Sequence, residues 1–364
     1  MPSDDAQPDN TDNRDNGVVV SPEELSNILS RRSTLVASDP HLSFLQTRLD
    51  SYLSSAHAPS TVQQYTRTFA QFCSWCTDHA LDPLPASIHS VELYLVHLAE
   101  KRLSDSSLNQ SYSSILWAHR LADLPQPRSD TAHLIIESTK RSTSQQPKRQ
   151  KEPLPRSALQ AICQSARSSS DLVKLRTAVM CSIAYFGFLR FQELQALRLG
   201  DVQFAQDSIS LLIRQSKTDQ YRRGNTVTLG RSGDIDCPYF LLCQYLDLHS
   251  KTVDGTGFVF CKLRHTPSGS YRFLSASKLA YSTAMSNLRA APTEAGVPNP
   301  GRFGLHSLRS GGATLAANSG VPMDLLQKHG QWASASARDC YIQDDLPRRI
   351  SVTAAMFDHS ADSA

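Results

Sequence analysis

The sequence predicts a mostly α-helical protein with two folded domains, the second of which also holds a small antiparallel sheet. Apolar residues recur at helical spacing through residues 42–137, a polar and basic stretch with prolines occupies 138–155, and strand-like alternation is confined to 202–229. A chain of 364 residues, 40% hydrophobic and 20% charged, can bury two cores of this kind. We therefore expect a helical bundle followed by a mixed α/β domain.

The N-terminal end is predicted to be a mostly disordered acidic tail covering residues 1–41. Residues 1–40 contain eight acidic and three basic residues, and the first twenty include few large apolar side chains. One short helix is expected to follow Ser21, because a serine followed by Pro22 and two glutamates is typical of a helix start. The rest of the chain is basic, and a basic body suits a polyanionic partner.

The first domain is expected to contain four helices within residues 42–137. The first carries leucines at helical spacing from Leu42 to Leu53, the second has an aromatic stripe that ends at Cys76, and the others follow Ser90 and Ser107. Short connections between helices favour a small bundle.

Residues 138–155 are predicted to form a basic linker, because their composition is polar and proline-bearing. The cations of this stretch are the candidates for contact with a polyanion: Lys140, Arg141, Lys148, Arg149 and Lys151.

The second domain is expected over residues 156–364, with helices around one β-hairpin. Helices are predicted at 156–166, 171–199, 238–250, 275–290, 307–319, from Met323 onward and near the C-terminus, and strands at 208–213 and 226–229. We find no run of 18 apolar residues and no secretory or mitochondrial targeting pattern. The eight cysteines are expected to be reduced thiols. The protein is therefore expected to contact no membrane and not to be secreted. We expect it to be nuclear in a eukaryotic host, and cytoplasmic or nucleoid-associated otherwise.

Four short boxes in the second domain carry side chains suited to phosphate chemistry. In chain order they hold Arg190, Glu193, Lys217, His306, Arg309, Trp332 and Tyr341. Each box alone has an ordinary explanation, such as a surface ion pair, a solvated turn lysine, a helix cap or a core tyrosine. Together they supply guanidinium forks for phosphate oxygens, a tyrosine nucleophile and proton donors. These are the groups needed to break a phosphodiester without a metal.

This order of residues resembles the tyrosine recombinase, or phage integrase, family. The stretch HSLRSGGAT and the nine-residue spacing from Trp332 to Tyr341 carry most of the resemblance. The run through GVP, HGQW and YI is also similar to recombinases of eukaryotic mobile elements, such as the DIRS-like and Crypton-like groups. The resemblance implies the tyrosine recombinase fold, with residues 42–137 as a SAM-like core-binding domain that binds DNA and residues 156–364 as the catalytic domain.

The resemblance also implies a role for each matching residue. Tyr341 would attack the DNA backbone, leaving a 3′-phosphotyrosine and a free 5′-hydroxyl. Lys217 would protonate that leaving hydroxyl, and His306 would assist proton transfer and orient the phosphate. The energy of the phosphodiester would be conserved in the new bond, so no ATP, metal or other cofactor is implied.

The remaining residues would bind or support the phosphate. Arg190 and Arg309 would hold it, and Glu193 would anchor Arg190. Trp332 stands where many family members have a second histidine, and it would donate through its indole N–H. The five basic residues of the linker become DNA-binding candidates under this interpretation.

The resemblance further implies double-stranded DNA as the partner, held in a clamp of two domains, and four protomers assembled on DNA. The apolar C-terminal helix is expected to dock on a neighbouring protomer. Two alternatives stay open: a type IB topoisomerase-like enzyme that relaxes DNA, and a non-catalytic DNA-binding protein derived from a recombinase.

Overall fold

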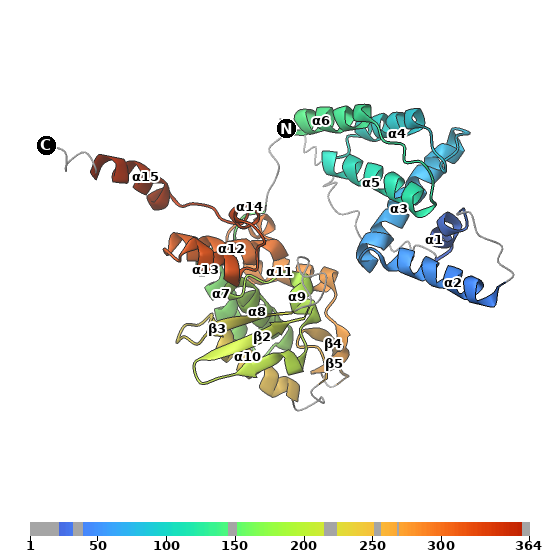
Figure 1. The fold of residues 1–364 in the computed structure, drawn as a ribbon. Coiled ribbons are helices and arrows are strands. Elements are labelled where there is room, and N and C mark those ends of the chain that lie inside the picture. Colours follow the sequence, from blue (N-terminus) through green and yellow to red (C-terminus); the bar gives the residue numbers. More distant parts are fainter. Residues whose placement is uncertain are drawn as a thin grey trace, which may run out of the picture. The chain divides into compact units, whose positions relative to one another are not determined.

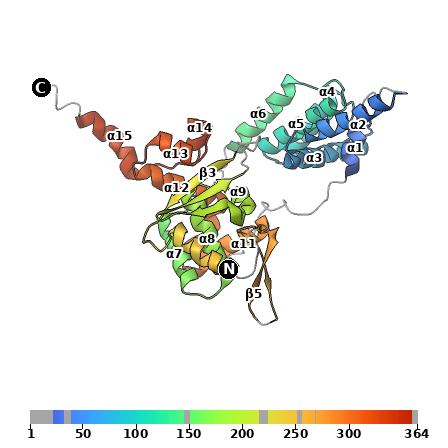
Figure 2. The same ribbon diagram turned by 60° about the horizontal axis from the view of Figure 1, so that its bottom comes forward.

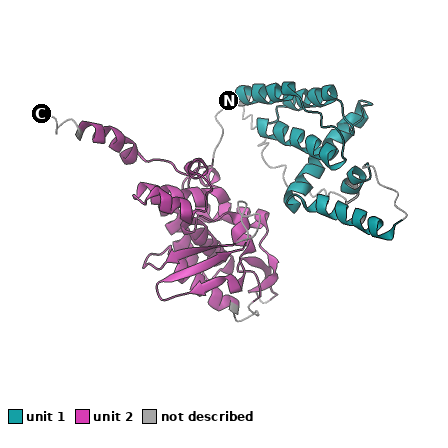
Figure 3. Cartoon of the chain, in the orientation of Figure 1, with its two compact units in different colours: residues 1–148 teal, residues 149–364 magenta. Residues whose placement is uncertain are grey.

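The computed structural model describes residues 22–31, 39–144, 151–214, 224–250, 256–267 and 269–358. The chain divides into two compact units, residues 1–148 and 149–364, which we describe separately (Figure 3).

The described part of the first unit is entirely helical (Figure 1). Its helices are α1 (Pro22–Leu29), α2 (Pro40–Ser55), α3 (Pro59–Asp78), α4 (Ile88–Glu100), α5 (Asp105–Leu121) and α6 (Asp130–Ser144). Helices α3 to α6 pack around a core that includes the fully buried Phe72, Leu95, Leu108 and Ile115. The aromatic stripe predicted from the sequence therefore faces the core, as helical spacing requires.

The bundle differs from the prediction in its first and last helices. The leucines of α2 do not form its core, since Leu42, Leu45 and Leu49 are 48%, 46% and 39% exposed. Helix α6 was not predicted as a separate helix, and it contributes Ala132 and Ile136 to the core instead.

Helices α4 and α5 also begin earlier than predicted. Their caps are Ser87 and Ser104, whose hydroxyls accept the backbone N–H of Ser90 and Ser107 respectively.

The linker predicted at 138–155 is too long at both ends. Helix α6 continues to Ser144, so Lys140 and Arg141 are exposed residues of its last turns. Leu154 belongs to the second unit, where it is 1% exposed and its N–H donates to the Ser307 carbonyl. The polar composition is the same in the helix and beyond it, which is why composition alone placed the boundary poorly.

The second unit is built around one central helix, α8 (Leu172–Phe186), whose Ala178, Val179, Cys181 and Ile183 are fully buried. Four helices pack against it: α7 (Arg156–Arg167), α10 (Pro238–Ser250), α11 (Tyr281–Glu294) and α12 (Leu305–Asn318). The unit also contains three short helices and a C-terminal helix (Figures 1 and 2). These are α9 (Phe191–Ala196), α13 (Met323–His329), α14 (Ala335–Asp339) and α15 (Leu346–Asp358).

Two small antiparallel sheets complete this unit. The first has the order β1 (Val202–Phe204), β2 (Ser208–Ile213), β3 (Asn225–Gly230), and the second pairs β4 (Cys261–His265) with β5 (Tyr271–Lys278). In the first sheet Leu211 lies opposite Val227, and both side chains are buried, because alternate residues of each strand face the core. The predicted hairpin of β2 and β3 is confirmed.

Two predicted helices of the second unit need correction, and three of its strands were not predicted. The helix predicted at 171–199 ends at Phe186 and resumes at Phe191. The helix predicted at 275–290 begins at Tyr281, because Ser275 to Lys278 belong to β5. Strands β1, β4 and β5 were not predicted, because β1 has only three residues and the exposed residues of β4 and β5 are mostly polar.

Candidate active site

The break between α8 and α9 places Arg190 at the start of a new helix. Gly187 ends α8 where an added Cβ would lie 2.8 Å from the Ile183 carbonyl oxygen, and Phe188 takes a left-handed backbone with φ 49°. The chain then becomes extended at Arg190, the N-cap of α9. The sequence interpretation of one continuous helix is therefore wrong, although it correctly pairs Arg190 with Glu193.

Glu193 holds Arg190 from two directions. Its Oε1 accepts from the guanidinium Nη1 at 2.7 Å, and its Oε2 accepts from the backbone N–H of Arg190 at 2.8 Å. Glu193 is 4% exposed, so this charged pair lies where solvent screens it little. The arginine keeps further N–H groups that the carboxylate does not engage.

Helix α12 carries Arg309 into the core because two glycines let it approach its neighbours closely. A Cβ on Gly311 would lie 2.3 Å from the Leu154 carbonyl oxygen, and one on Gly312 would lie 1.9 Å from the Tyr185 carbonyl oxygen. The SGG of the HSLRSGG box therefore serves helix packing.

Arg309 joins three segments of the chain. Its guanidinium donates to the Phe188 carbonyl and, at 2.7 Å, to the Gly330 carbonyl. Phe188 belongs to the break after α8, and Gly330 directly follows α13. One side chain thus ties α12 to the segments that hold Arg190 and Trp332.

Two aromatic rings enclose the same guanidinium. The Arg309 Cζ lies 4.7 Å from the Trp332 ring centre and 4.9 Å from the Tyr341 ring centre. The two rings are 5.5 Å apart, and Trp332 also packs on Phe188. Three of the predicted residues, from two of the four boxes, therefore meet in one cluster.

This cluster contains polar groups that lack partners. Arg309 is 1% exposed and forms no ion pair with a carboxylate in the described part of the chain. Its Nε and the Trp332 Nε1 are buried, and neither has a hydrogen-bond acceptor among the described residues. Burial lowers the pKa of Arg309, with the charge of Arg190 acting in the same direction and Glu193 opposing it. Buried unpaired donors of this kind are costly unless a ligand engages them.

The Tyr341 segment is fastened to α12 by side chains that the sequence analysis did not single out. Thr314 donates its hydroxyl to the Tyr341 carbonyl at 3.2 Å and accepts the Gln343 N–H at 3.1 Å. Asn318 donates to the Gln343 carbonyl at 3.2 Å. Their spacing was the one signal in the sequence, because residues four apart, such as Thr314 and Asn318, lie on the same face of a helix.

The other predicted residues lie outside this cluster or outside the described residues. His306 is exposed in the first turn of α12, one turn before Arg309. Lys217, Lys148 and Arg149 lie outside the residues that the structure describes. Lys151 is exposed, and its Nζ donates to the Gly301 carbonyl at 2.7 Å.

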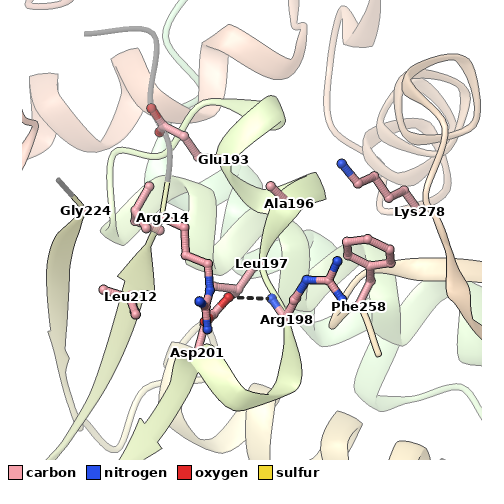
Figure 4. A pocket seen from close by; sticks show the side chains of 11 residues that line it. Glu193, Ala196, Leu197, Arg198, Asp201, Leu212, Arg214, Gly224, Phe258 and Lys278 are labelled. Carbon is pink, nitrogen blue, oxygen red and sulfur yellow. Dashed lines mark hydrogen bonds and ion pairs between the residues drawn. The ribbon is translucent and has the colours of Figure 1, made fainter. Parts of the chain in front are cut away.

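A cleft of about 550 Å³ lies beside Glu193 and was not foreseen (Figure 4). Arg198, Arg214 and Lys278 line it, and Arg198 and Lys278 both contact the ring of Phe258. In the residues that the structure describes, no group of three or more His, Cys, Asp or Glu side chains could hold a metal ion. The same part of the chain contains no helix long and apolar enough to cross a membrane.

Comparison with protein families places this site in context. The model of the phage integrase family matches residues 152–346, a span that includes every predicted catalytic residue. The chain belongs to this family. Its members are recombinases and integrases, which break and rejoin DNA. The resemblance to the tyrosine recombinases is thereby confirmed, whereas the narrower resemblance to eukaryotic mobile elements stays a prediction.

Individual relatives have low sequence identity to this chain but match long stretches of it. The chain is 21% identical to the recombinase Cre of Escherichia phage P1 over 283 residues, covering 75% of this chain and 80% of that protein. It is 22% identical to an integrase/recombinase XerD homologue of Selenomonas ruminantium over 199 residues, covering 54% and 58%.

Solved structures confirm the fold class. The XerH site-specific recombinase bound to difH substrate matches with a TM-score of 0.59 and 15% identity, over 92% of this chain and 94% of that one. The Tn1549 transposon integrase in complex with circular intermediate DNA matches with a TM-score of 0.51 and 13% identity, over 91% and 98%. The tyrosine recombinase fold was predicted correctly.

Proposed function

We propose that the protein cuts and rejoins duplex DNA through a 3′-phosphotyrosine intermediate, with Tyr341 as the nucleophile. The buried guanidinium of Arg309 carries this proposal. It has no carboxylate partner among the described residues, its Nε is unpaired, and the Tyr341 ring packs against it. A phosphodiester would neutralise this charge and engage its donors. A nucleophile must lie next to the phosphate-binding group, and Tyr341 does.

In the proposed reaction the Tyr341 oxygen bonds to phosphorus while the bond from phosphorus to the 5′-oxygen breaks. Arg190 and Arg309 stabilise the charge that develops on the non-bridging oxygens, and the Trp332 N–H adds a donor. Lys217 gives its proton to the 5′-oxygen, as the family resemblance implies. The resemblance gives His306 a part in proton transfer, and we assign uptake of the phenol proton to it. Attack by a 5′-hydroxyl reverses these steps, so rejoining needs no ATP.

Phosphate binding requires a rearrangement at Arg309. The packed rings leave this side chain only 1% exposed, so the Tyr341 ring must turn away before a phosphate can reach it. The hydrogen bonds from Thr314 hold the backbone at Tyr341 while the ring turns. This movement would keep the nucleophile idle until DNA is bound.

We further propose that the reaction serves integration or site-specific recombination of a mobile element. The matched XerH and Tn1549 proteins were both solved with DNA, which supports duplex DNA as the partner here. Two duplexes cut on both strands need four tyrosines, and hence a tetramer on DNA. Helix α15 would link the protomers, because Ile350, Val352, Met356 and Phe357 are more than half exposed on it.

The test is covalent capture of DNA. The full-length protein is incubated with a pool of nicked mixed-sequence duplexes, adducts are trapped in denaturant, and the attached 3′ ends are sequenced. Wild-type protein should form adducts, and Tyr341→Phe should form none while binding DNA equally well. Tyr281→Phe, which changes a tyrosine that is 55% exposed on α11, should behave as wild type. An adduct formed by Tyr341→Phe would show that the nucleophile is misassigned.

The same preparation distinguishes the alternatives. A topoisomerase-like enzyme would relax supercoiled plasmid of any sequence and would leave no preferred adduct site. A non-catalytic descendant would bind the duplexes but form no adduct at any site.

A further inference from the structure

The β4–β5 hairpin is a basic surface segment of the second unit that the proposed chemistry leaves unused. Residues 261–278 include no acidic residue, and they carry Lys262, Arg264, Arg272 and Lys278. Figure 2 shows β5 extending away from the helices of this unit. All four cations are exposed.

The strand register gathers three of these cations on one face. Arg264 lies directly opposite Arg272, and Lys262 is two residues from Arg264 and so projects to the same side. The opposite face holds Phe273, which is 6% exposed and packs on Tyr245 of α10 at 5.6 Å. The basic face is therefore turned to solvent.

This arrangement is unfavourable for the protein alone. Like charges directly opposite each other destabilise an antiparallel pair. No carboxylate pairs with Arg264, Arg272 or Lys262 within the described ranges of the chain. An uncompensated row of cations on a projecting ribbon fits a ligand that carries a regular row of negative charge.

We propose that the outer face of the β4–β5 hairpin binds the phosphate backbone of duplex DNA beside the cleavage site, an inference that rests on the proposed function. Lys278, at the base of the hairpin, lines the same cleft as Glu193, and Glu193 holds Arg190 (Figure 4). The strand register places Arg272 opposite Arg264 and Lys278 opposite Cys261, which are three residues apart, so at about 3.3 Å per residue Arg272 lies roughly 10 Å along the hairpin from Lys278. The basic face is therefore close enough to the cleft to contact the same duplex.

The test compares two neutralised variants of the full-length chain. Arg264→Gln/Arg272→Gln removes the opposed pair. Arg167→Gln/Arg289→Gln removes the same number of charges from exposed positions on α7 and α11 and serves as the control. Each protein is titrated with a 40-base-pair mixed-sequence duplex at several salt concentrations. The hairpin variant should lower the slope of log affinity against log salt by about 1.8, which is about 0.9 for each lost phosphate contact. The control should leave the slope unchanged.

Two further measurements locate the contact. On duplexes recovered from the adduct experiment, wild-type affinity should rise when the DNA beyond the cleaved phosphate is lengthened stepwise from a short duplex until it reaches the hairpin. The hairpin variant should show no such rise, and its adduct rate on the short duplex should equal that of wild type. Without DNA, the variant should melt at a higher temperature at low salt, because the opposed like charges are gone.

An unchanged salt slope together with a retained length dependence would overturn the proposal. If no adduct forms with any duplex, the proposed catalytic function fails. The salt slope on mixed-sequence DNA still decides whether the hairpin binds DNA.

Discussion

Arg309 has a structural role in addition to its proposed role in binding phosphate, and the structural role explains why it is so deeply buried. Its hydrogen bonds to Phe188 and Gly330 hold the break after α8 and the end of α13 in place. Its Nε–H has no acceptor among the described residues, and the Trp332 and Tyr341 rings pack against the guanidinium. The sequence pointed to the phosphate-binding role through the HSLR box. The structural role depends on backbone carbonyls, which no residue pattern displays.

Replacing either arginine should slow cleavage strongly. Arg190→Ala and Arg309→Ala should each lower the single-turnover rate of adduct formation by about 10²-fold or more, the loss typical of one preorganised charge-stabilising donor. Circular dichroism and melting should accompany the Arg309 measurement, because that side chain also supports the fold. Cleavage at near-normal rate by the Arg190 variant would make the Arg190–Glu193 pair purely structural.

Trp332 permits a finer test, because its ring and its N–H can be separated. Trp332→Phe keeps the packing against Phe188 but removes the unpaired donor, so we expect adduct formation to slow by about tenfold or more with unchanged DNA affinity. Trp332→His restores a ring N–H and should recover part of the rate. Equal rates for the Phe variant and wild type would leave Trp332 as a packing residue only.

At the scale of elements, α12 organises the site. One end carries His306 and Arg309, its middle packs through Gly311 and Gly312, and its other end holds the Tyr341 segment through Thr314 and Asn318. A single rigid helix thus sets the spacing between phosphate ligand and nucleophile.

Thr314 should act on the nucleophile without acting on DNA binding. Thr314→Val keeps the shape but removes the hydroxyl, so adduct formation should slow by about tenfold while the dissociation constant stays constant, as positioning losses do. Hydrogen exchange at the Gln343 amide should quicken in the same variant, because its acceptor is gone. Thr314→Ser should restore both. A Val variant with normal exchange and slow cleavage would place the defect elsewhere.

The elements show which features a sequence displays. The helices and the strands β2 and β3 were readable because apolar residues repeat there with the proper period. Helix α2 was wrongly predicted to be a core helix, because its leucines have the period of a core helix but remain exposed. The break at Gly187 escaped notice because it depends on contact with the Ile183 carbonyl, and β4–β5 because its outward residues are charged. The sequence singled out Arg309, Trp332 and Tyr341, which the structure brings together, whereas Thr314 and the cleft arise only from tertiary packing.

At the scale of the whole molecule, DNA affinity should depend on both units. The slope of log affinity against log salt should be steeper for the full chain than for a fragment of residues 149–364. This slope grows with the number of phosphates that the protein neutralises. Competition with unlabelled duplex at two salt concentrations measures this. Equal slopes and equal affinity for the fragment and the full chain would contradict a two-domain clamp.

Assembly should depend on α15. Truncation after Pro347 removes its exposed apolar side chains, including Val352, Met356 and Phe357. The shortened protein should still form an adduct on a single site but should fail to join two sites, as measured by sedimentation of the complex and by recombinant product. Normal recombination by the truncated protein would move the assembly surface to another part of the chain.

The hydrogen bonds of Arg309 carry an evolutionary consequence. A copy that lost recombination but kept DNA binding could lose the Tyr341 hydroxyl at low cost to the fold, because the hydrogen bonds that fasten this segment to α12 use the Tyr341 carbonyl and the Gln343 N–H. It could not discard Arg309 as easily, since α12, the break after α8 and the end of α13 would lose their common anchor. Decay of such a gene should therefore begin at the nucleophile and reach the phosphate ligand last. A domesticated descendant should therefore be recognisable because it lacks the tyrosine at the position of Tyr341 but keeps the arginine at the position of Arg309.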